Sequence, residues 1–243
     1  MSFSNQSITA FAHDYETTGL DIMTLGVVQS ALCIATVHQD GSYEILDRDV
    51  TLLNPGEKIS AEASAIHGYT DFDVMDKPAW EAYLRGQMAT VNDLSCDAVI
   101  SFNGNRFDNR IAGRVGLQPL RSVDLYKAAA KFKKEQGWEK ANLGYSYQKL
   151  VGKPLEGAHD AFADIQATLD MILPAMQLAG AESLDDFCLW MKGDGGTPEM
   201  KIGFGKHKGS KLRNLPKDYI SWLLNKSDMG LDPDLKDGLE ACV

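Results

Sequence analysis

"FAHDYETTGLD", residues 11–21, places two carboxylates one residue apart, directly after an apolar run and just before a glycine. The residues that lead into it, 7–15 (SITAFAHDY), mix β-branched and aromatic side chains, which is typical of a strand. Residues i and i+2 of a strand point to the same face, so Asp14 and Glu16 are expected side by side. Like charges at that spacing repel, so either both carboxylates face water or a cation lies between them.

Two further strand-like runs follow, at residues 25–37 and 43–53, separated by the turn-type stretch HQDGS. After them, predicted helices alternate with short apolar strands. We expect strands at 96–102 and 120–126, and helices at 60–68, 78–94, from about 106, and at 127–134, 143–151 and 160–176. Strand runs followed by strand–helix alternation predict an α/β fold with a mixed sheet flanked by helices.

The composition is that of an ordinary globular protein of 243 residues, with 44% hydrophobic and 24% charged residues. No apolar run approaches the roughly 20 residues that span a bilayer, and the first residues lack a signal-peptide pattern. The four cysteines form no C-x-x-C pair, so we expect neither a zinc site nor a disulfide framework. We therefore expect a cytoplasmic protein without membrane contact.

The net charge of −10 argues against a protein that coats nucleic acid through bulk charge. The charge is uneven, however, because residues 106–153 hold 11 Lys or Arg against 4 Asp or Glu. This basic segment either forms a cationic track beside an acidic pocket or decorates solvated helix faces, and the pattern alone favours solvated faces.

Two other stretches carry chemistry-bearing side chains. Asp108, in SFNGNRFDNRI, follows a buried strand, at the sheet edge where α/β sites form; a helix-start acid is the alternative. His159 and Asp164 lie in EGAHDAFADIQATLDM, with Asp164 on a helix and His159 in the loop ahead of it, 157–159. Asp124, at the end of a predicted strand, is interpreted as a structural residue. Asp160, beside His159, is interpreted as a first-turn helix acid and not as a ligand.

Taken together, HDYETTGL, SFNGNRFDNR and AHDAFADIQAT resemble, in order and spacing, the three sequence blocks of the DEDDh (DnaQ-like) 3′–5′ exonucleases. The resemblance covers about residues 7–178 and is strongest to the bacterial exonuclease I and exonuclease X types. His159 places the chain in the branch with histidine, and SAIHGYTD (64–71) matches that family's I-H-G-I-T segment, with Tyr69 as a departure. The resemblance implies a ribonuclease H-like, five-stranded mixed sheet.

The resemblance also implies a mechanism with two Mg²⁺ or Mn²⁺ ions. Asp14, Glu16 and Asp164 would hold the first ion, with Asp14 bridging to a second that Asp108 supports, while His159 accepts a proton from the attacking water. The expected partner is a DNA 3′ end, preferably single-stranded. By the same resemblance, substrate contacts fall on Thr17, Thr18, Gly19, Leu20, His67 and Phe107; core packing is an equal alternative for Phe107.

We expect three parts: an exonuclease domain at 1–180, a connecting segment at 181–199 and a small basic module at 200–243. Residues 201–217 contain six Lys or Arg and no acid, which suits binding to strand phosphates. A helical cap packed through Tyr219, Trp222, Leu223 and Leu224 is the other reading, and both can hold. Oligomeric state stays open.

Other functions compatible with the sequence are an exoribonuclease of the same mechanism, a catalytically idle nucleic-acid-binding or polymerase-associated module, and an unrelated metal-binding α/β protein. Retention of all five motif residues weighs against the idle module. DNA and RNA are not distinguished, because ribose discrimination depends on few residues.

Overall fold

A computed structural model describes residues 6–193, 195, 197–225, 231 and 233–243. The chain forms two compact units, Met1–Phe187 and Cys188–Val243. The boundary falls inside the segment 181–199 that the sequence analysis assigned to the connection; residues 194 and 196 of that segment lie outside the described residues. Among the residues described, no helix is long and apolar enough to cross a membrane.

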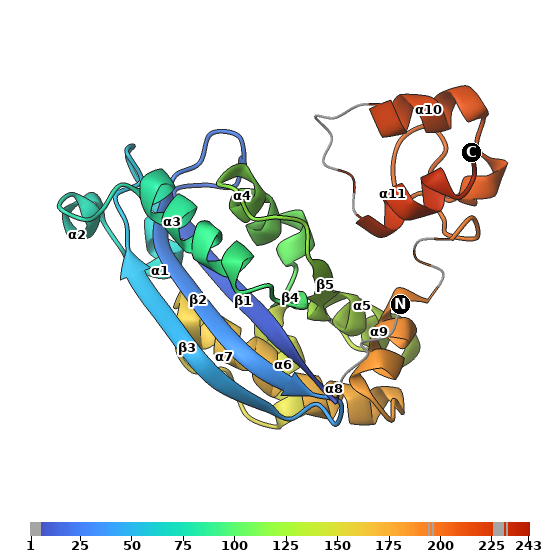
Figure 1. The fold of residues 1–243 in the computed structure, drawn as a ribbon, viewed down its shortest axis with the longest axis horizontal. Coiled ribbons are helices and arrows are strands. Elements are labelled where there is room, and N and C mark those ends of the chain that lie inside the picture. Colours follow the sequence, from blue (N-terminus) through green and yellow to red (C-terminus); the bar gives the residue numbers. More distant parts are fainter. Residues whose placement is uncertain (1–5, 194, 196, 226–230, 232) are drawn as a thin grey trace. The chain divides into compact units, whose positions relative to one another are not determined.

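The first unit contains a five-stranded sheet in the order β3-β2-β1-β4-β5 (Figure 1). Three long antiparallel strands, β1 (Ser7–Thr17), β2 (Val27–His38) and β3 (Tyr43–Leu52), form one side. The short strands β4 (Ala98–Ser101) and β5 (Arg121–Asp124) continue the sheet in parallel with β1. The predicted α/β fold with a mixed sheet is confirmed.

The central strand β1 has two unlike faces. Phe11 and Tyr15 lie on one of them, in a core with Leu84 and Met88 of helix α3 (Trp80–Asp93). Alternate positions on the other face carry the small, buried residues Ala10 and Ala12, then Asp14. Small side chains let a helix approach the sheet closely, and α7 (Ala161–Asp170) packs against β1 on the face opposite α3 (Figure 1).

The remaining helices surround this sheet, and Gly68 ends α1 in the left-handed conformation, as its position predicts. The prediction of a single helix at 160–176 is wrong, because this segment divides at Met171 into α7 and α8 (Ile172–Ala179). Pro174 explains the division, because its ring cannot pack under the carbonyl of Asp170 in a continuous helix. The other elements are α1 (Ala61–His67), α2 (Asp71–Val74), the 3₁₀ turn η1 (Gly104–Arg106), α4 (Asp108–Arg114), α5 (Leu125–Glu135), α6 (Leu143–Val151) and α9 (Leu184–Lys192).

The second unit has its own small core, built around the turn η2 (Leu212–Asn214), α10 (Lys217–Asn225) and α11 (Pro233–Glu240). Leu223 is fully buried in this core, with Tyr219 and Leu224 packed against it, as the helical-cap reading expects. Trp222 does not follow that reading, because 46% of it is exposed. Helix α9, at the junction of the two units, was not expected from the sequence.

Candidate active site

The site begins where β1 extends past its neighbour β4. Pairing with β4 ends at Ala12, whereas pairing with β2 continues to Thr17, so Asp14 and Glu16 lie on a stretch that β4 does not cover. A register irregularity between Glu16 and Thr17 marks a β-bulge, a feature common beside functional sites. The pair Asp14 and Glu16 therefore stands beyond the carboxyl end of β4, with both side chains on one strand as predicted.

Helix α4 brings a third carboxylate to the stretch of β1 that β4 does not cover. Asp108 is its first residue, and the side chain is only 6% exposed. Its carboxylate accepts hydrogen bonds from its own backbone N–H and from that of Tyr15, which lies beyond the reach of β4. His13 fixes the helix further, since its Nε2 lies 2.7 Å from Oδ1 of Asn109.

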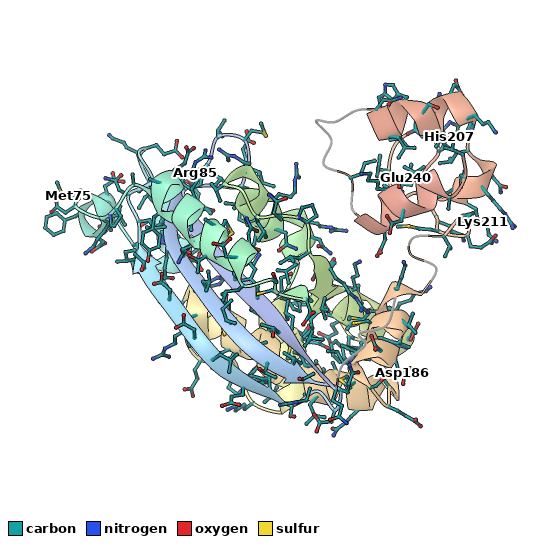
Figure 2. All side chains as sticks on the ribbon, in the orientation of Figure 1. Met75, Arg85, Asp186, His207, Lys211 and Glu240 are labelled. Carbon is teal, nitrogen blue, oxygen red and sulfur yellow. The ribbon has the colours of Figure 1, made fainter. Side chains whose placement is uncertain are left out.

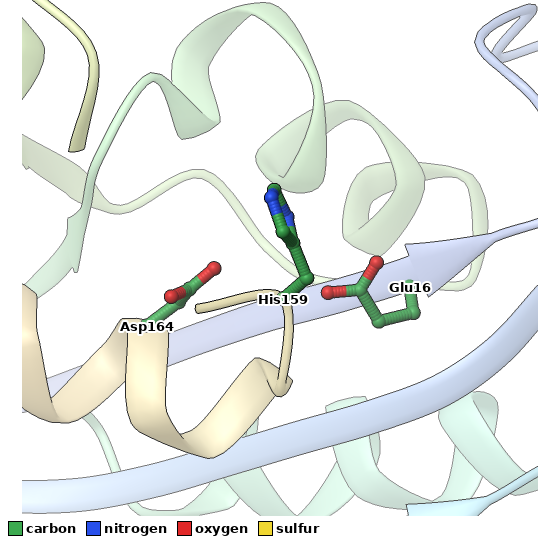
Figure 3. Close-up of side chains that lie close together, drawn as sticks. All are labelled: Glu16, His159 and Asp164. Atoms are coloured by element: carbon green, nitrogen blue, oxygen red, sulfur yellow. The ribbon is translucent and has the colours of Figure 1, made fainter. Parts of the chain in front are cut away.

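The turn ahead of α7 supplies His159 and Asp164. Asp160 caps the helix by accepting from the N–H of Ala163 at 3.0 Å, which confirms its structural assignment. His159 lies in the preceding turn with φ 70°, exposed to solvent, as predicted, rather than in the helix. Its backbone N–H donates to the carboxylate of Asp164, one turn into α7. The imidazole thus lies between Glu16 and Asp164 (Figure 3).

A glutamine that the sequence analysis did not single out holds this turn in place. Gln29, buried on β2, accepts from the N–H of Ala161 at 3.0 Å and donates to Oδ2 of Asp160 at 3.2 Å and to the Tyr69 hydroxyl at 2.9 Å. These bonds join the start of α7 to the sheet and to the segment after α1. Nothing local in the sequence marks a strand glutamine for such a role.

Asp14, Glu16, Asp108, His159 and Asp164 form one cluster, and its electrostatics favour a bound cation. Burial, followed by repulsion from Asp108, Asp164 and Glu16, raises the pKa of Asp14 well above its usual value. Burial is also the main cause that raises the pKa of Glu16 to about 8 and that of Asp108 to about 7. The pKa of Asp164 rises to about 6, again through burial, although the N–H and imidazole of His159 oppose the rise. These carboxyls cannot all ionise at neutral pH without compensating positive charge.

The donor set fits a divalent metal. Glu16, His159 and Asp164 each offer a ligand atom, and these atoms lie within 4.8 Å of one another. Oδ1 of Asp164 is buried, yet finds no hydrogen-bond partner among the described residues. A buried carboxylate oxygen left unpaired is costly, and oxygen-rich sites suit Mg²⁺ or Mn²⁺.

We therefore expect metal-free protein to lose stability as pH rises. The Glu16 carboxyl, with a pKa of about 8 against an ordinary 4.5, binds more protons when folded than when unfolded between these values. The stabilising effect is complete below the unfolded pKa and disappears as pH rises through the folded one. In EDTA the melting temperature should fall across this window, and Mg²⁺ should restore more stability at pH 8 than at pH 5.

Two variants test whether Glu16 causes the pH dependence of the melting temperature. Glu16→Gln should flatten the pH profile in EDTA, whereas Asp93→Asn, at an exposed acid of α3, should leave it unchanged. An equal Mg²⁺-induced rise in melting temperature at both pH values would contradict the assignment.

A cleft of about 560 Å³ opens on the cluster. Asp14 and Asp164 form part of its wall, and Lys133 and Lys140 another part, together with Tyr126 and Asn142. Lys133 and Lys140 both belong to the basic segment 106–153 noted in the sequence, whereas Asn142 was not singled out there. A cleft lined by both carboxylates and lysines suits a phosphate chain bound through both metal and ammonium groups.

Not every basic residue considered for phosphate contact faces this cleft. The guanidinium of Arg114 donates to the carbonyl of Ile22 and lies 5.5 Å from the Trp80 ring centroid, so Arg114 anchors the loop after β1. Asp124 is structural, as interpreted: its buried carboxylate accepts from the N–H groups of Asn103 (2.7 Å) and Tyr126 (3.0 Å).

The expected substrate contacts are placed as follows. The Thr17 hydroxyl donates to the Gly19 carbonyl at 2.8 Å, and the Thr18 hydroxyl donates to Glu57 at 2.5 Å, so both side chains are engaged within the loop. Leu20 is 88% exposed. His67 lies near the Thr17 backbone and near His159. Phe107 packs partly buried against the core, which agrees with its alternative reading. Their role in substrate binding stays a prediction.

Comparison with known proteins agrees with this geometry. The sequence profile of the RNase_T family, described as exonuclease, matches residues 11–172. The chain is 31% identical over 203 residues to the uncharacterized exonuclease CP81 of Escherichia phage 186, which covers 74% of this chain and all of that protein.

Solved structures share the fold. A structure of exonuclease I matches with a TM-score of 0.64 at 18% identity, covering 85% of this chain and 50% of that chain. The zinc-bound E. coli exonuclease I complex with single-stranded DNA matches with a TM-score of 0.58 at 20% identity, covering 70% of this chain and 41% of that chain. This chain thus spans about half the length of exonuclease I or less. The profile match over most of the first unit and the identity to the phage protein establish that the chain belongs to the RNase_T exonuclease family.

Proposed function

We propose that the protein is a metal-dependent 3′–5′ exodeoxyribonuclease that removes nucleotides from single-stranded DNA ends. The observation that carries this proposal is the convergence of four carboxylates and one imidazole, from β1, α4 and the start of α7, on a cleft with lysines on its wall. The E. coli exonuclease I structure with bound single-stranded DNA supports DNA as the substrate class.

In this proposal Asp14, Glu16 and Asp164 hold one Mg²⁺ or Mn²⁺ ion, and Asp14 and Asp108 support a second. When bound, such ions acidify water and neutralise the charge that develops on the phosphate. His159, exposed at the mouth of the site, accepts the proton that water loses as it adds to phosphorus. The P–O3′ bond breaks, the O3′ of the shortened strand gains a proton, and a nucleoside 5′-monophosphate leaves.

The decisive assay follows 5′-labelled single-stranded DNA incubated with Mg²⁺. A ladder of products shortened from the 3′ end, absent in EDTA, is the expected result. Matched DNA and RNA oligonucleotides compared in the same assay decide between exodeoxyribonuclease and exoribonuclease. Intact DNA and RNA after long incubation with either Mg²⁺ or Mn²⁺ would leave only a binding function.

Gln29 provides a test of how the proposed general base, His159, is positioned. Gln29→Ala removes the bonds to Ala161 and Asp160, so the turn that carries His159 loses its attachment to β2. We expect kcat to fall on the order of ten- to a hundredfold, as misplacement of a catalytic group produces, with KM little changed.

The matched control is Gln87→Ala, because Gln87 of α3 also bonds a β2 residue, Ser30, away from the cluster. Gln87→Ala should change kcat less than threefold, within the range of a remote substitution (about 1 kcal/mol or less). A rise in KM alone for Gln29→Ala would contradict a positioning role.

A further inference from the structure

The second unit carries an aromatic stack on its surface. Tyr219 and Trp222 lie three residues apart on α10, which places them on one side of the helix. Their rings stack with centroids 5.6 Å apart and an interplanar angle of 18°. His207 meets Tyr219 edge-on at 4.6 Å. Trp222 is nearly half exposed although the core beside it is well packed, so the stack presents a flat aromatic face to solvent.

A tight loop holds a cation over this stack. The loop closes through the Gly209 N–H, which donates to Ile202 at 2.7 Å, and Gly205 within it has φ 69°. A Cβ at Gly205 would lie 2.6 Å from the Tyr219 hydroxyl, so only glycine permits this approach. The next residue, Lys206, places its Nζ 5.3 Å from the Tyr219 ring centroid.

The charge around the stack is unbalanced. Glu199 pairs with Lys211 at 2.6 Å and with Arg213, which partly neutralises the positive charge on one side of the unit. Lys206 and Lys208 are exposed and have no carboxylate partner among the residues that the structure describes. His207, between these two lysines, and Lys211, on the partly neutralised side, are labelled in Figure 2.

A second cleft, of about 410 Å³, lies at the stack and is lined by Lys206, Asp218, Tyr219 and Trp222. Stacked rings with ammonium groups beside them are what unstacked bases and their phosphates need. We propose that this cleft is a single-stranded nucleic-acid site, with a base stacked on Trp222 and adjacent phosphates bound by Lys206 and Lys208. The choice of ligand rests on the proposed function. The site holds the strand independently of the catalytic cluster and, because one chain carries both, raises the local substrate concentration at the nuclease unit.

The test uses the full chain carrying Asp14→Ala, so that the strand stays intact, and measures binding of fluorescent oligothymidylate by anisotropy. Trp222→Ala should weaken binding by about five- to a hundredfold, the range that base stacking supplies, and Trp222→Phe should retain most of it. Lys206→Ala should reduce the slope of log Kd against log salt by about one. Lys236→Ala, at an exposed lysine of α11 paired with Glu240, is the charge-matched control and should change little.

Two further readouts locate the ligand and identify its class. Photocrosslinking with 5-iodouracil-substituted strand should label the tryptic peptide that begins at Asp218. Asp218→Asn should tighten binding, since Asp218 is the one acid among the described residues that line the cleft. Weaker binding in this variant would indicate a cationic ligand instead and overturn the proposal.

The outcomes separate this site from the proposed function. If the chain with Asp14 intact shortens DNA but Trp222→Ala binds as tightly as its parent, the second site is refuted while the nuclease stands. If Trp222→Ala weakens binding and crosslinks fall on α10 although no variant cleaves DNA or RNA, the nuclease proposal fails and the binding site stands.

Discussion

Asp14→Asn is expected to abolish cleavage while making the metal-free protein more stable. Asp14 is buried and is repelled by Asp108, Asp164, Glu16 and Asp160, so its charge is poorly tolerated when no cation is present. Asparagine keeps the shape and removes that repulsion, which should raise the melting temperature in EDTA. The same change removes a metal-binding charge, and cleavage should fall roughly a thousandfold or more, since several kcal/mol of charge stabilisation disappear.

The matched control is Asp124→Asn, the same change at another buried acid at the edge of the sheet. Asp124 accepts from the N–H groups of Asn103, Asn105 and Tyr126 through both carboxylate oxygens. Asparagine turns one of these acceptors into an NH₂ donor, so the free energy of unfolding should fall by about 1–3 kcal/mol, and the melting temperature with it. Cleavage time courses and thermal melts in EDTA give both readouts. Asp14→Asn protein that melts lower than its parent in EDTA and still cleaves DNA would refute the role assigned to the cluster.

His159→Asn is expected to lower kcat by about two to four orders of magnitude, the usual contribution of a positioned general base. Asparagine is the best replacement because it tolerates the left-handed backbone at this position, φ 70°, where most residues are strained. The fold and the two carboxylates beside the imidazole, Glu16 and Asp164, should therefore survive. Since His159 is exposed, added imidazole should reach the vacated space and restore part of the rate.

The affinity for Mg²⁺ shows whether His159 acts as a general base or as a metal ligand. Titration calorimetry should give the same Mg²⁺ affinity for His159→Asn as for the parent. His38→Asn, at the exposed end of β2, controls for loss of a surface histidine and should leave kcat and affinity unchanged. A large loss of Mg²⁺ affinity in His159→Asn, with no rescue by imidazole, would identify His159 as a metal ligand instead.

Local patterns in the sequence predicted much of this architecture. The alternation around Asp14 and Glu16 follows from strand geometry, and Gly68 stops a helix because glycine adopts the left-handed conformation readily. The five cluster residues were identified because their motifs resemble a known family, not because any one of them is distinctive. The placement of His159 ahead of α7 also follows from the sequence, since a helical position would turn it away from Asp164.

The features that were missed depend on contacts between distant segments. Gln29 acts on a turn that lies more than a hundred positions later in the chain, and nothing near it in the sequence indicates this. Asn142 lines the cleft because α5 packs against β4 and α6 packs against α7, the helix that carries Asp164. The break at Met171 was predictable, because Pro174 carries the signal for it; the apolar spacing that continues across the proline led to a single helix being assigned.

The distance along the chain between Asp14 and Asp164 has a consequence for the cell that makes this protein. During synthesis the ribosome releases the strand that holds the first acids long before the helix that holds the last, and metal affinity depends on having all of them in place. A nascent or truncated polypeptide that ends before Asp164 therefore lacks part of the metal site that the proposed activity needs. The metal site on which the proposed nuclease activity depends is complete only when almost the whole first unit has emerged and closed around its sheet.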